Sequence, residues 1–272
     1  MKSLSTNITH LTLIDCSNFL QSIKWETLKK LVYLDINLDE RDERDAGLKL
    51  CSVSKNLRHL LICGDVQFNV AGISFEAGFG FPELRSLRFR GNYWDHTDTK
   101  AFRYCCANSP KLEDIYVFGE FESTETYDTV AQSIGSLLSR PALRKLELDI
   151  YDCREPSENQ LVVESIINLI NCPNEKPKLE DLILHPNCSL ASIYHLVNGN
   201  YNLKSLELHG KVHQKETVAD IIKILNCESG LETIRFSGKC RNSVIPEDFA
   251  IRLGGRISRD RFPKLVEDLQ KR

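Results

Sequence analysis

The chain has 272 residues, of which 42% are hydrophobic and 27% charged, and its 35 basic and 38 acidic residues give a formal net charge of −3. This composition is typical of globular proteins and argues against a disordered chain, while the balanced charge gives no reason to expect nucleic acid as a partner. No apolar run approaches the roughly 18 residues of a membrane-spanning helix, and the first residues lack the apolar segment of a secretory signal. We therefore expect a protein of the cytoplasm or the nucleus without a membrane partner.

A short apolar signature recurs along the whole chain. It has the form L-x-x-L-x-L, with Ile, Val or Phe allowed, and its nine copies start 23 to 36 residues apart. Self-similarity at a period of about 20 to 50 residues predicts a solenoid, in which each repeat packs only on its neighbours. In chain order the copies are Ile8-Leu11-Leu13, Leu31-Leu34-Ile36, Leu57-Leu60-Ile62, Leu84-Leu87-Phe89, Leu112-Ile115-Val117, Leu143-Leu146-Leu148, Leu179-Leu182-Leu184, Leu203-Leu206-Leu208 and Leu231-Ile234-Phe236.

Each signature predicts one short strand, because its last apolar residues alternate with polar ones at the period of two that a half-buried strand shows. Parallel strands need long connections, and the intervals between signatures are long enough to supply them. Several of these intervals have apolar residues at helical steps of three and four, namely 130–138, 161–170, 190–197 and 218–225.

We therefore predict an α/β fold: a solenoid of about nine repeats over residues 8–240, with a parallel sheet on its concave side and helices on its convex side. Repeats have no internal boundary, so one domain over residues 1–272 is expected. Residues 241–272 lack a further signature and are predicted to form a C-terminal cap.

The repeats resemble those of leucine-rich repeat proteins, specifically the ribonuclease-inhibitor-like and F-box-associated, cysteine-containing types. Cys16, Asn92 and Asn187 fill the ninth position that Asn or Cys occupies in that family, whereas Cys188 and Cys240 come one place later. The resemblance implies a horseshoe fold and a role in protein binding. It also implies a possible role as substrate receptor of an SCF-type (cullin) ubiquitin ligase, with the ligase adaptor as a second partner. Residues 1–7 are too few to hold an F-box, so that box would be absent or upstream.

The ten cysteines are scattered along the repeats without a cluster at either end, so we expect reduced, structural thiols. The adjacent pair Cys105-Cys106 does not form a C-x-x-C motif. Because neighbouring helical residues point about 100° apart, one of the two thiols is expected in the core and the other partly exposed.

The usual motifs for phosphate, dinucleotide, zinc-protease and hydrolase chemistry are absent from the sequence, so we predict no enzyme activity, no catalytic residue and no cofactor. His185 and His209 take equivalent places on consecutive repeats, where two stacked imidazoles could share a metal. Polar side chains are expected at such outward positions anyway. A structural or surface role is therefore favoured, and no metal site is predicted.

The third, fifth and seventh positions of each signature are expected to project from the concave sheet. Arg88 and Arg90 then lie beside Tyr116 and Phe118, and Arg and aromatic residues are the types enriched in binding hot spots. The following repeats are acidic at these positions, so the face would favour a partner of complementary charge. The predicted partner-binding residues are Tyr33, Arg88, Arg90, Tyr116, Phe118, Phe121, Glu147, Asp149, Asp181, His185, Glu207 and His209. Alternatively, exposed positions are polar by default and this division of charge is accidental.

Two long repeats, starting at Leu112 and Leu143, are expected to carry loops at residues 119–128 and 151–158. Insertions in repeats often map to the binding side, and the aromatic residues Phe121, Tyr127 and Tyr151 would extend the binding surface. They are equally consistent with variable turns that have no role.

The predicted function is a non-catalytic, monomeric protein-recognition module. The alternative is a regulator that binds and modulates an enzyme, as ribonuclease-inhibitor-like and Ran GTPase-activating proteins do. An inhibitor would be expected to have a strongly charged concave face, and the mixed charge predicted here argues mildly against that alternative.

Overall fold

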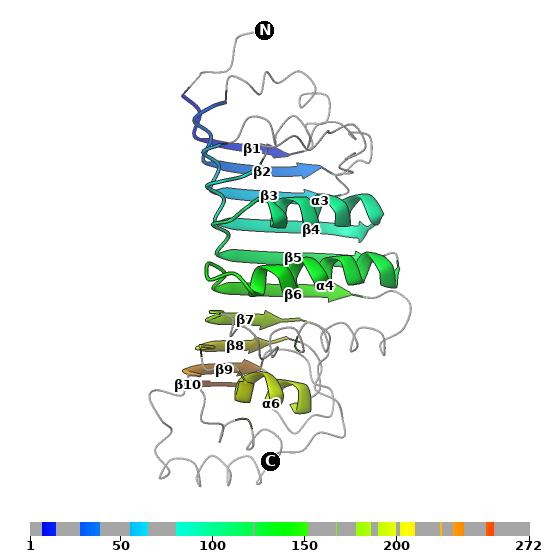
Figure 1. The fold of residues 1–272 in the computed structure, drawn as a ribbon, viewed down its shortest axis with the longest axis vertical. Helices are drawn as coiled ribbons and strands as arrows, with labels where there is room; N and C mark the ends of the chain where they lie inside the picture. Colours follow the sequence, from blue (N-terminus) through cyan, green and yellow to red (C-terminus); the bar gives the residue numbers. More distant parts are fainter. Residues whose placement is uncertain are drawn as a thin grey trace. The chain divides into compact units, whose positions relative to one another are not determined.

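Figure 1 shows the computed structural model of the chain, which describes residues 7–14, 28–38, 55–64, 80–121, 123–151, 167, 178–185, 190–199, 202–209, 224, 231–236 and 249–252. The chain divides into two compact units, residues 1–137 and 138–272, and each is described by itself. The single domain stays a prediction. Within the described residues, no helix is both long and apolar enough to cross a membrane.

The first unit contains a parallel sheet whose strands follow one another in chain order. The described strands are β1 (His10–Ile14), β2 (Tyr33–Leu38), β3 (His59–Gly64), β4 (Ser86–Trp94) and β5 (Asp114–Phe121). Each strand begins at the same place in its signature, so the equivalent apolar residues lie side by side. One such row, nearly free of solvent beyond its first member, is Leu11, Leu34, Leu60, Leu87 and Ile115. The prediction of one parallel strand per signature is confirmed for these repeats.

A repeated backbone contact fixes the register at the start of each strand. The carbonyl of Thr9 accepts hydrogen bonds from the successive amides of Val32 and Tyr33, at 2.8 and 3.0 Å. The carbonyl of Val32 then accepts from the two amides that begin the next strand, Arg58 and His59. The same arrangement recurs at every described parallel junction within the first unit. Because a one-residue slip would turn every leucine to the other face, this contact also protects the core.

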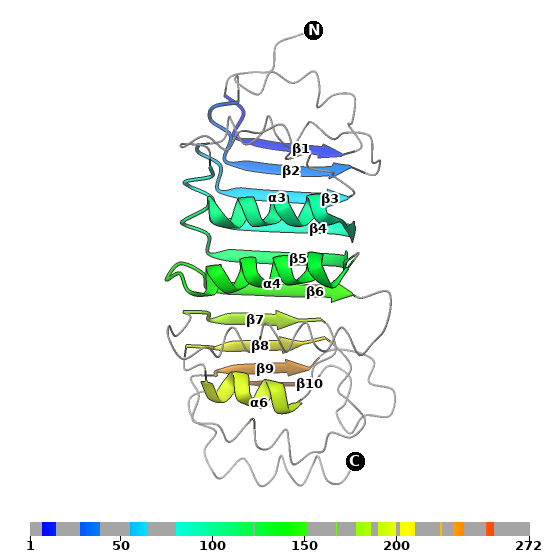
Figure 2. The same ribbon diagram turned by 45° about the vertical axis from the view of Figure 1, so that its right-hand side comes forward.

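The helices α3 (His96–Ala107) and α4 (Thr124–Leu138) lie on one face of the strands of the first unit (Figures 1 and 2). Reciprocal side-chain bonds begin α3: the amide of Asp98 donates to Oδ1 of Asp95 at 3.0 Å, and the amide of Asp95 donates to Oδ2 of Asp98 at 3.2 Å. Ser123 and Thr126 make the corresponding exchange at the start of α4. Such capping boxes satisfy amides that a helix start leaves without partners.

An aromatic cluster joins α3 to the sheet. Trp94 at the end of β4 and Phe102 on α3 are both 0% exposed, with ring centroids 5.5 Å apart, and Phe89 packs 4.6 Å from Trp94. Cys105 and Cys106, also on α3, are 4% and 1% exposed. The prediction that one of these thiols would be partly exposed is therefore wrong, because the helix is covered on a face wide enough to hold both.

A bulge in β4 places Trp94. Arg90 lies opposite Phe118 and Tyr93 opposite Glu120, so three steps on β4 match two on β5. The extra residue turns the indole back toward β5, where its Nε1–H donates to the carbonyl of Phe118 at 2.9 Å. Gly119 has a φ of +144°, and a Cβ there would lie 2.1 Å from the carbonyl oxygen of Gly91. Only glycine fits this close approach of the two strands.

The second unit repeats the parallel pattern. The strands β6 (Lys145–Tyr151), β7 (Asp181–Leu184), β8 (Ser205–Leu208) and β9 (Thr233–Phe236) are parallel neighbours in chain order, and β10 (Phe249–Arg252) pairs antiparallel with β9. The helix α6 (Leu190–Gly199) buries Ile193, Leu196 and Val197 completely. Of the predicted cap at 241–272, only β10 lies within the described residues.

The predicted helices at 130–138 and 190–197 are confirmed as α4 and α6. The predictions at 161–170 and 218–225 lie outside the described residues except for Ile167 and Ile224, which are both helical and buried. The loop expected at 119–128 is wrong, because β5 continues to Phe121 and α4 begins at Thr124. The loop expected at 151–158 lies outside the described residues beyond Tyr151, which ends β6.

Candidate functional site

The exposed face of the first unit consists of the side chains that alternate with the buried leucines. The strand register arranges them in three rows running from β1 to β5: His10, Tyr33, His59, Ser86 and Asp114; Thr12, Asp35, Leu61, Arg88 and Tyr116; and Ile14, Asn37, Cys63, Arg90 and Phe118.

Two arginines and two aromatic residues form a cationic–aromatic patch on this face, defined as Arg88, Arg90, Tyr116 and Phe118. Arg88 lies opposite Tyr116 and Arg90 opposite Phe118 on the neighbouring strand. Both arginines are exposed, and both aromatic residues are half-buried. The Cζ atom of Arg90 lies 4.6 Å from the centroid of the Phe118 ring, a cation–π contact that stabilises by about 0.5–1 kcal/mol at an exposed site. The strands thus bring together the four residues that the sequence predicted as neighbours.

Three aromatic rings follow one another along the first row. The rings of His10 and Tyr33 stack with centroids 5.7 Å apart and an interplanar angle of 22°. The ring of His59 lies 6.2 Å from that of Tyr33, tilted by 40°. Tyr33 was among the predicted site residues, whereas His10 and His59 were not, although their positions in the signature place them in the same row.

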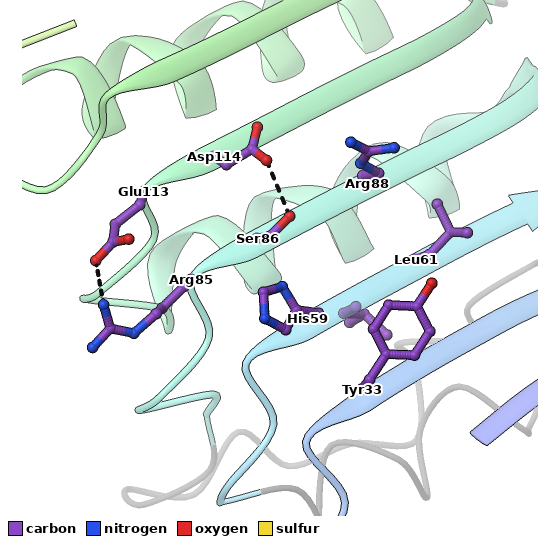
Figure 3. Close-up of a pocket in the computed structure, with 9 residues that line it drawn as sticks. Tyr33, His59, Leu61, Arg85, Ser86, Arg88, Glu113 and Asp114 are labelled. Atoms are coloured by element: carbon purple, nitrogen blue, oxygen red, sulfur yellow. Dashed lines mark hydrogen bonds and ion pairs between the residues drawn. The ribbon is translucent and has the colours of Figure 1, made fainter. Parts of the chain in front are cut away.

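A hollow of about 430 Å³ opens between the aromatic row and Arg88 (Figure 3). Figure 3 shows the side chains around it on one side of β2, β3, β4 and the start of β5. The lining residues are Tyr33, His59, Leu60, Leu61, Arg85, Ser86, Arg88, Glu113 and Asp114.

The acidic side chains of the hollow already have partners. Glu113 forms an ion pair with Arg85 at 2.7 Å, and Asp114 accepts a hydrogen bond from the hydroxyl of Ser86 at 3.3 Å. Arg88 forms no ion pair with any residue that the structure describes. On the neighbouring β2, burial raises the pKa of the Asp35 carboxyl, a shift in the opposite direction to the one a paired cation would cause. Arg88 is therefore the charge in this hollow that remains available to an anionic group.

The exposed face of the second unit holds a histidine–carboxylate cluster, defined as Glu147, Asp149, His185, Glu207 and His209. The rings of His185 and His209 stack 4.2 Å apart with an interplanar angle of 4°. Nε2 of His209 lies 2.9 Å from Oε1 of Glu207. Nε2 of His185 lies 3.4 Å from Oε1 of Glu147, and its Nδ1 lies 3.6 Å from Oδ1 of Asp149.

The two imidazoles of this cluster meet face to face, and ring nitrogens of both lie within 3.6 Å of carboxylate oxygens. Throughout the described ranges, no group of three or more His, Cys, Asp or Glu residues is placed to hold a metal ion. Burial and then the neighbouring His185 lower the pKa of His209, against the opposite effect of Glu207. The neighbouring His185 thus disfavours a proton on His209.

Several other predicted site residues have different surroundings. Phe121 is only 5% exposed, and its ring packs 5.3 Å from Trp94 and 5.5 Å from Tyr127. We therefore correct the expectation that Phe121 and Tyr127 extend the binding surface: both lie in the core. Asp149 is 7% exposed, while Asp181 is half-buried on β7.

Comparison with known proteins gave no assignment. The chain matches no model of a protein family, and the search of curated proteins found no match. The argument for function therefore depends on the surfaces described above.

Proposed function

We propose that the chain is a non-catalytic protein-recognition module, a leucine-rich repeat solenoid whose exposed face in the first unit binds a protein partner. The observation that carries this proposal is the cationic–aromatic patch of Arg88, Arg90, Tyr116 and Phe118. Arg and Tyr are enriched among residues that dominate binding energies, and Phe is enriched at interfaces generally.

The setting of the patch also supports binding. Its four residues stand on two strands whose inward-facing neighbours, Leu87, Phe89, Ile115 and Val117, are at most 2% exposed. The backbone is therefore held in place before a partner arrives. A surface that is already ordered loses less conformational entropy on association, so more of the contact energy appears as affinity.

For the wider role, we propose a substrate receptor of an SCF-type (cullin) ubiquitin ligase, on the basis of the resemblance to F-box-associated repeats. The alternative, a regulator of an enzyme, would be favoured by a strongly charged face. In the second unit the carboxylates of Glu147 and Glu207 already contact Lys145 and Arg235, at 4.0 and 3.3 Å. This internal pairing leaves less charge to match a target, which favours the receptor role over the inhibitor.

The test is affinity capture from a cell extract with three forms of the chain, read by mass spectrometry. The first is the wild type, and the second is Arg88→Glu/Tyr116→Ala. The third is the control Arg103→Glu, which reverses the charge of an exposed arginine on α3, away from the exposed face. Circular dichroism and thermal unfolding establish that all three forms are folded.

We expect one protein to be captured by the wild type and the control but not by the double variant. A cullin and its adaptor captured with all three forms would support the receptor role. A single enzyme or GTPase lost with the double variant would support the regulator instead. If every captured protein also binds the double variant, the assignment of the cationic–aromatic patch is wrong.

A further inference from the structure

The hollow beside the patch has one side suited to an anion. Among its lining residues, Arg85 and Arg88 carry positive charge and Glu113 and Asp114 carry negative charge. Arg85 and Glu113 neutralise each other at 2.7 Å, and the Asp114 carboxylate accepts from Ser86. Arg90 lies over the ring of Phe118. Arg88 is exposed and lacks an ion pair within the described part of the chain, so its guanidinium group can bind a carboxylate through two N–H donors.

The other side of the hollow is apolar. Leu61 on β3 and the ring of Tyr33 on β2 line it, together with the imidazole of His59 at the start of β3 (Figure 3). Leu61 lies directly opposite Arg88 in the strand register. A ligand that fills the hollow therefore meets a cation and an apolar surface on adjacent strands.

The spacing of the strands defines what kind of ligand reaches both sides. Neighbouring strands lie about 4.8 Å apart, so the space between Tyr33 and Leu61 is centred about 7 Å from the line of Arg88. An extended peptide places alternate side chains on one side at nearly the same interval, about 7 Å. A segment that crosses the strands can thus present one side chain to Arg88 and the side chain two positions away to Leu61 and Tyr33.

We propose that this hollow binds an extended segment of a protein partner that carries a carboxylate two residues from a bulky apolar side chain. The proposal rests on the proposed function and specifies the partner for the same face. The carboxylate pairs with Arg88, and the apolar side chain lies against Leu61 and the Tyr33 ring. The carboxylates of Asp114, which accepts a hydrogen bond from Ser86, and of Asp35 on β2 lie near the hollow and weaken the binding of an acidic segment.

The test uses the full chain and a displayed library of random 12-residue peptides. Peptides enriched on the wild type are expected to share Asp or Glu two positions from Leu, Ile, Phe or Trp. A synthetic peptide with this pattern is then titrated by fluorescence polarisation. Arg88→Gln should raise its Kd about tenfold, which corresponds to about 1.4 kcal/mol. Asp114→Asn should lower the Kd severalfold, and Arg103→Glu on α3 should leave it unchanged.

The Kd is expected to rise in Arg88→Gln and to fall in Asp114→Asn. Damage to the fold would instead weaken peptide binding in both variants, so the two changes together distinguish recognition from misfolding. Enriched peptides without an acidic residue, or an unchanged Kd in Arg88→Gln, would overturn the proposal. Failure to enrich any peptide would also overturn it. None of these results decides the proposed function. The capture experiment with Arg88→Glu/Tyr116→Ala tests that function separately, because a folded partner can bind the face without an extended segment.

Discussion

Replacing Gly119 by alanine tests how the sheet of the first unit accommodates Trp94. The added methyl carbon would lie 2.1 Å from the carbonyl oxygen of Gly91 and 2.5 Å from Nε1 of Trp94. Both distances are far below ordinary contact, and the φ of +144° is one that alanine rarely adopts. The strands must therefore separate, and the indole must leave the carbonyl of Phe118 that it bonds at 2.9 Å.

Two costs add in this variant. Holding a residue other than glycine in such a backbone conformation costs about 1–3 kcal/mol. Leaving the buried indole N–H without its acceptor costs about 1–3 kcal/mol more. Gly119→Ala should therefore lower the free energy of unfolding by about 4 kcal/mol. The matched control is Gly91→Ala, whose Cβ would meet Trp94 at 3.0 Å at an ordinary φ, for which we expect a loss of about 1 kcal/mol.

The assay is a urea titration followed by tryptophan fluorescence and by far-ultraviolet circular dichroism. Fluorescence reports on the surroundings of the two tryptophans, Trp25 and Trp94, and circular dichroism reports on the helices and strands together. The reasoning is refuted if Gly119→Ala unfolds within about 1 kcal/mol of the wild type, or if Gly91→Ala is the more destabilised of the two.

Three further predictions concern charge and helix capping. The lowered pKa of His209 means that the unfolded chain binds the proton first, so the free energy of unfolding should fall as pH drops below about 6.5. Urea titrations across this range should show a weaker dependence in His209→Gln, and an identical dependence would contradict the cause. Burial raises the pKa of Asp35, so the charged carboxyl opposes folding at pH 7, and Asp35→Asn should raise the melting temperature there but not at pH 3, where aspartate is largely protonated in both states. Asp95→Ala removes the acceptor for the Asp98 amide and should cost about 1 kcal/mol in a urea titration, and an unchanged midpoint would show that this cap contributes nothing.

The strands could be predicted from the sequence because their signal is local and repeated. Every described parallel strand contains the last apolar residues of one signature, and the alternation within it sets which side is buried. A helix was expected at Cys105 and Cys106, but the bounds of α3 were not predicted, because polar residues occupy part of its buried side. Thr99 is 0% exposed and Asp98 is 8% exposed. The Thr99 hydroxyl donates a hydrogen bond to the carbonyl of His96, and the Asp98 carboxylate accepts one from the amide of Asp95. These bonds allow both polar side chains to be buried, and a pattern of hydrophobic residues cannot reveal them.

For the candidate site, the sequence could predict only which residues lie side by side on neighbouring strands. The signature places Arg88 beside Tyr116, and it places His185 beside His209. It does not reveal that Arg85 pairs with Glu113, 28 residues away, which depends on how two long side chains turn at the ends of their strands. Phe121 was misassigned for a different reason. A loop was expected from residue 119, whereas β5 continues to Phe121 and its regular alternation places that residue on the same buried side as Ile115 and Val117.

The paired amides that begin each strand have a consequence for how this chain can change over evolution. The contact uses only backbone atoms, and the leucine rows face away from the exposed rows. A substitution at Arg88 or Tyr116 therefore alters what the surface selects without touching what joins one strand to the next. Selection can act on partner choice and on stability through separate sets of positions. A new specificity can then arise one residue at a time, while the scaffold beneath it stays unchanged.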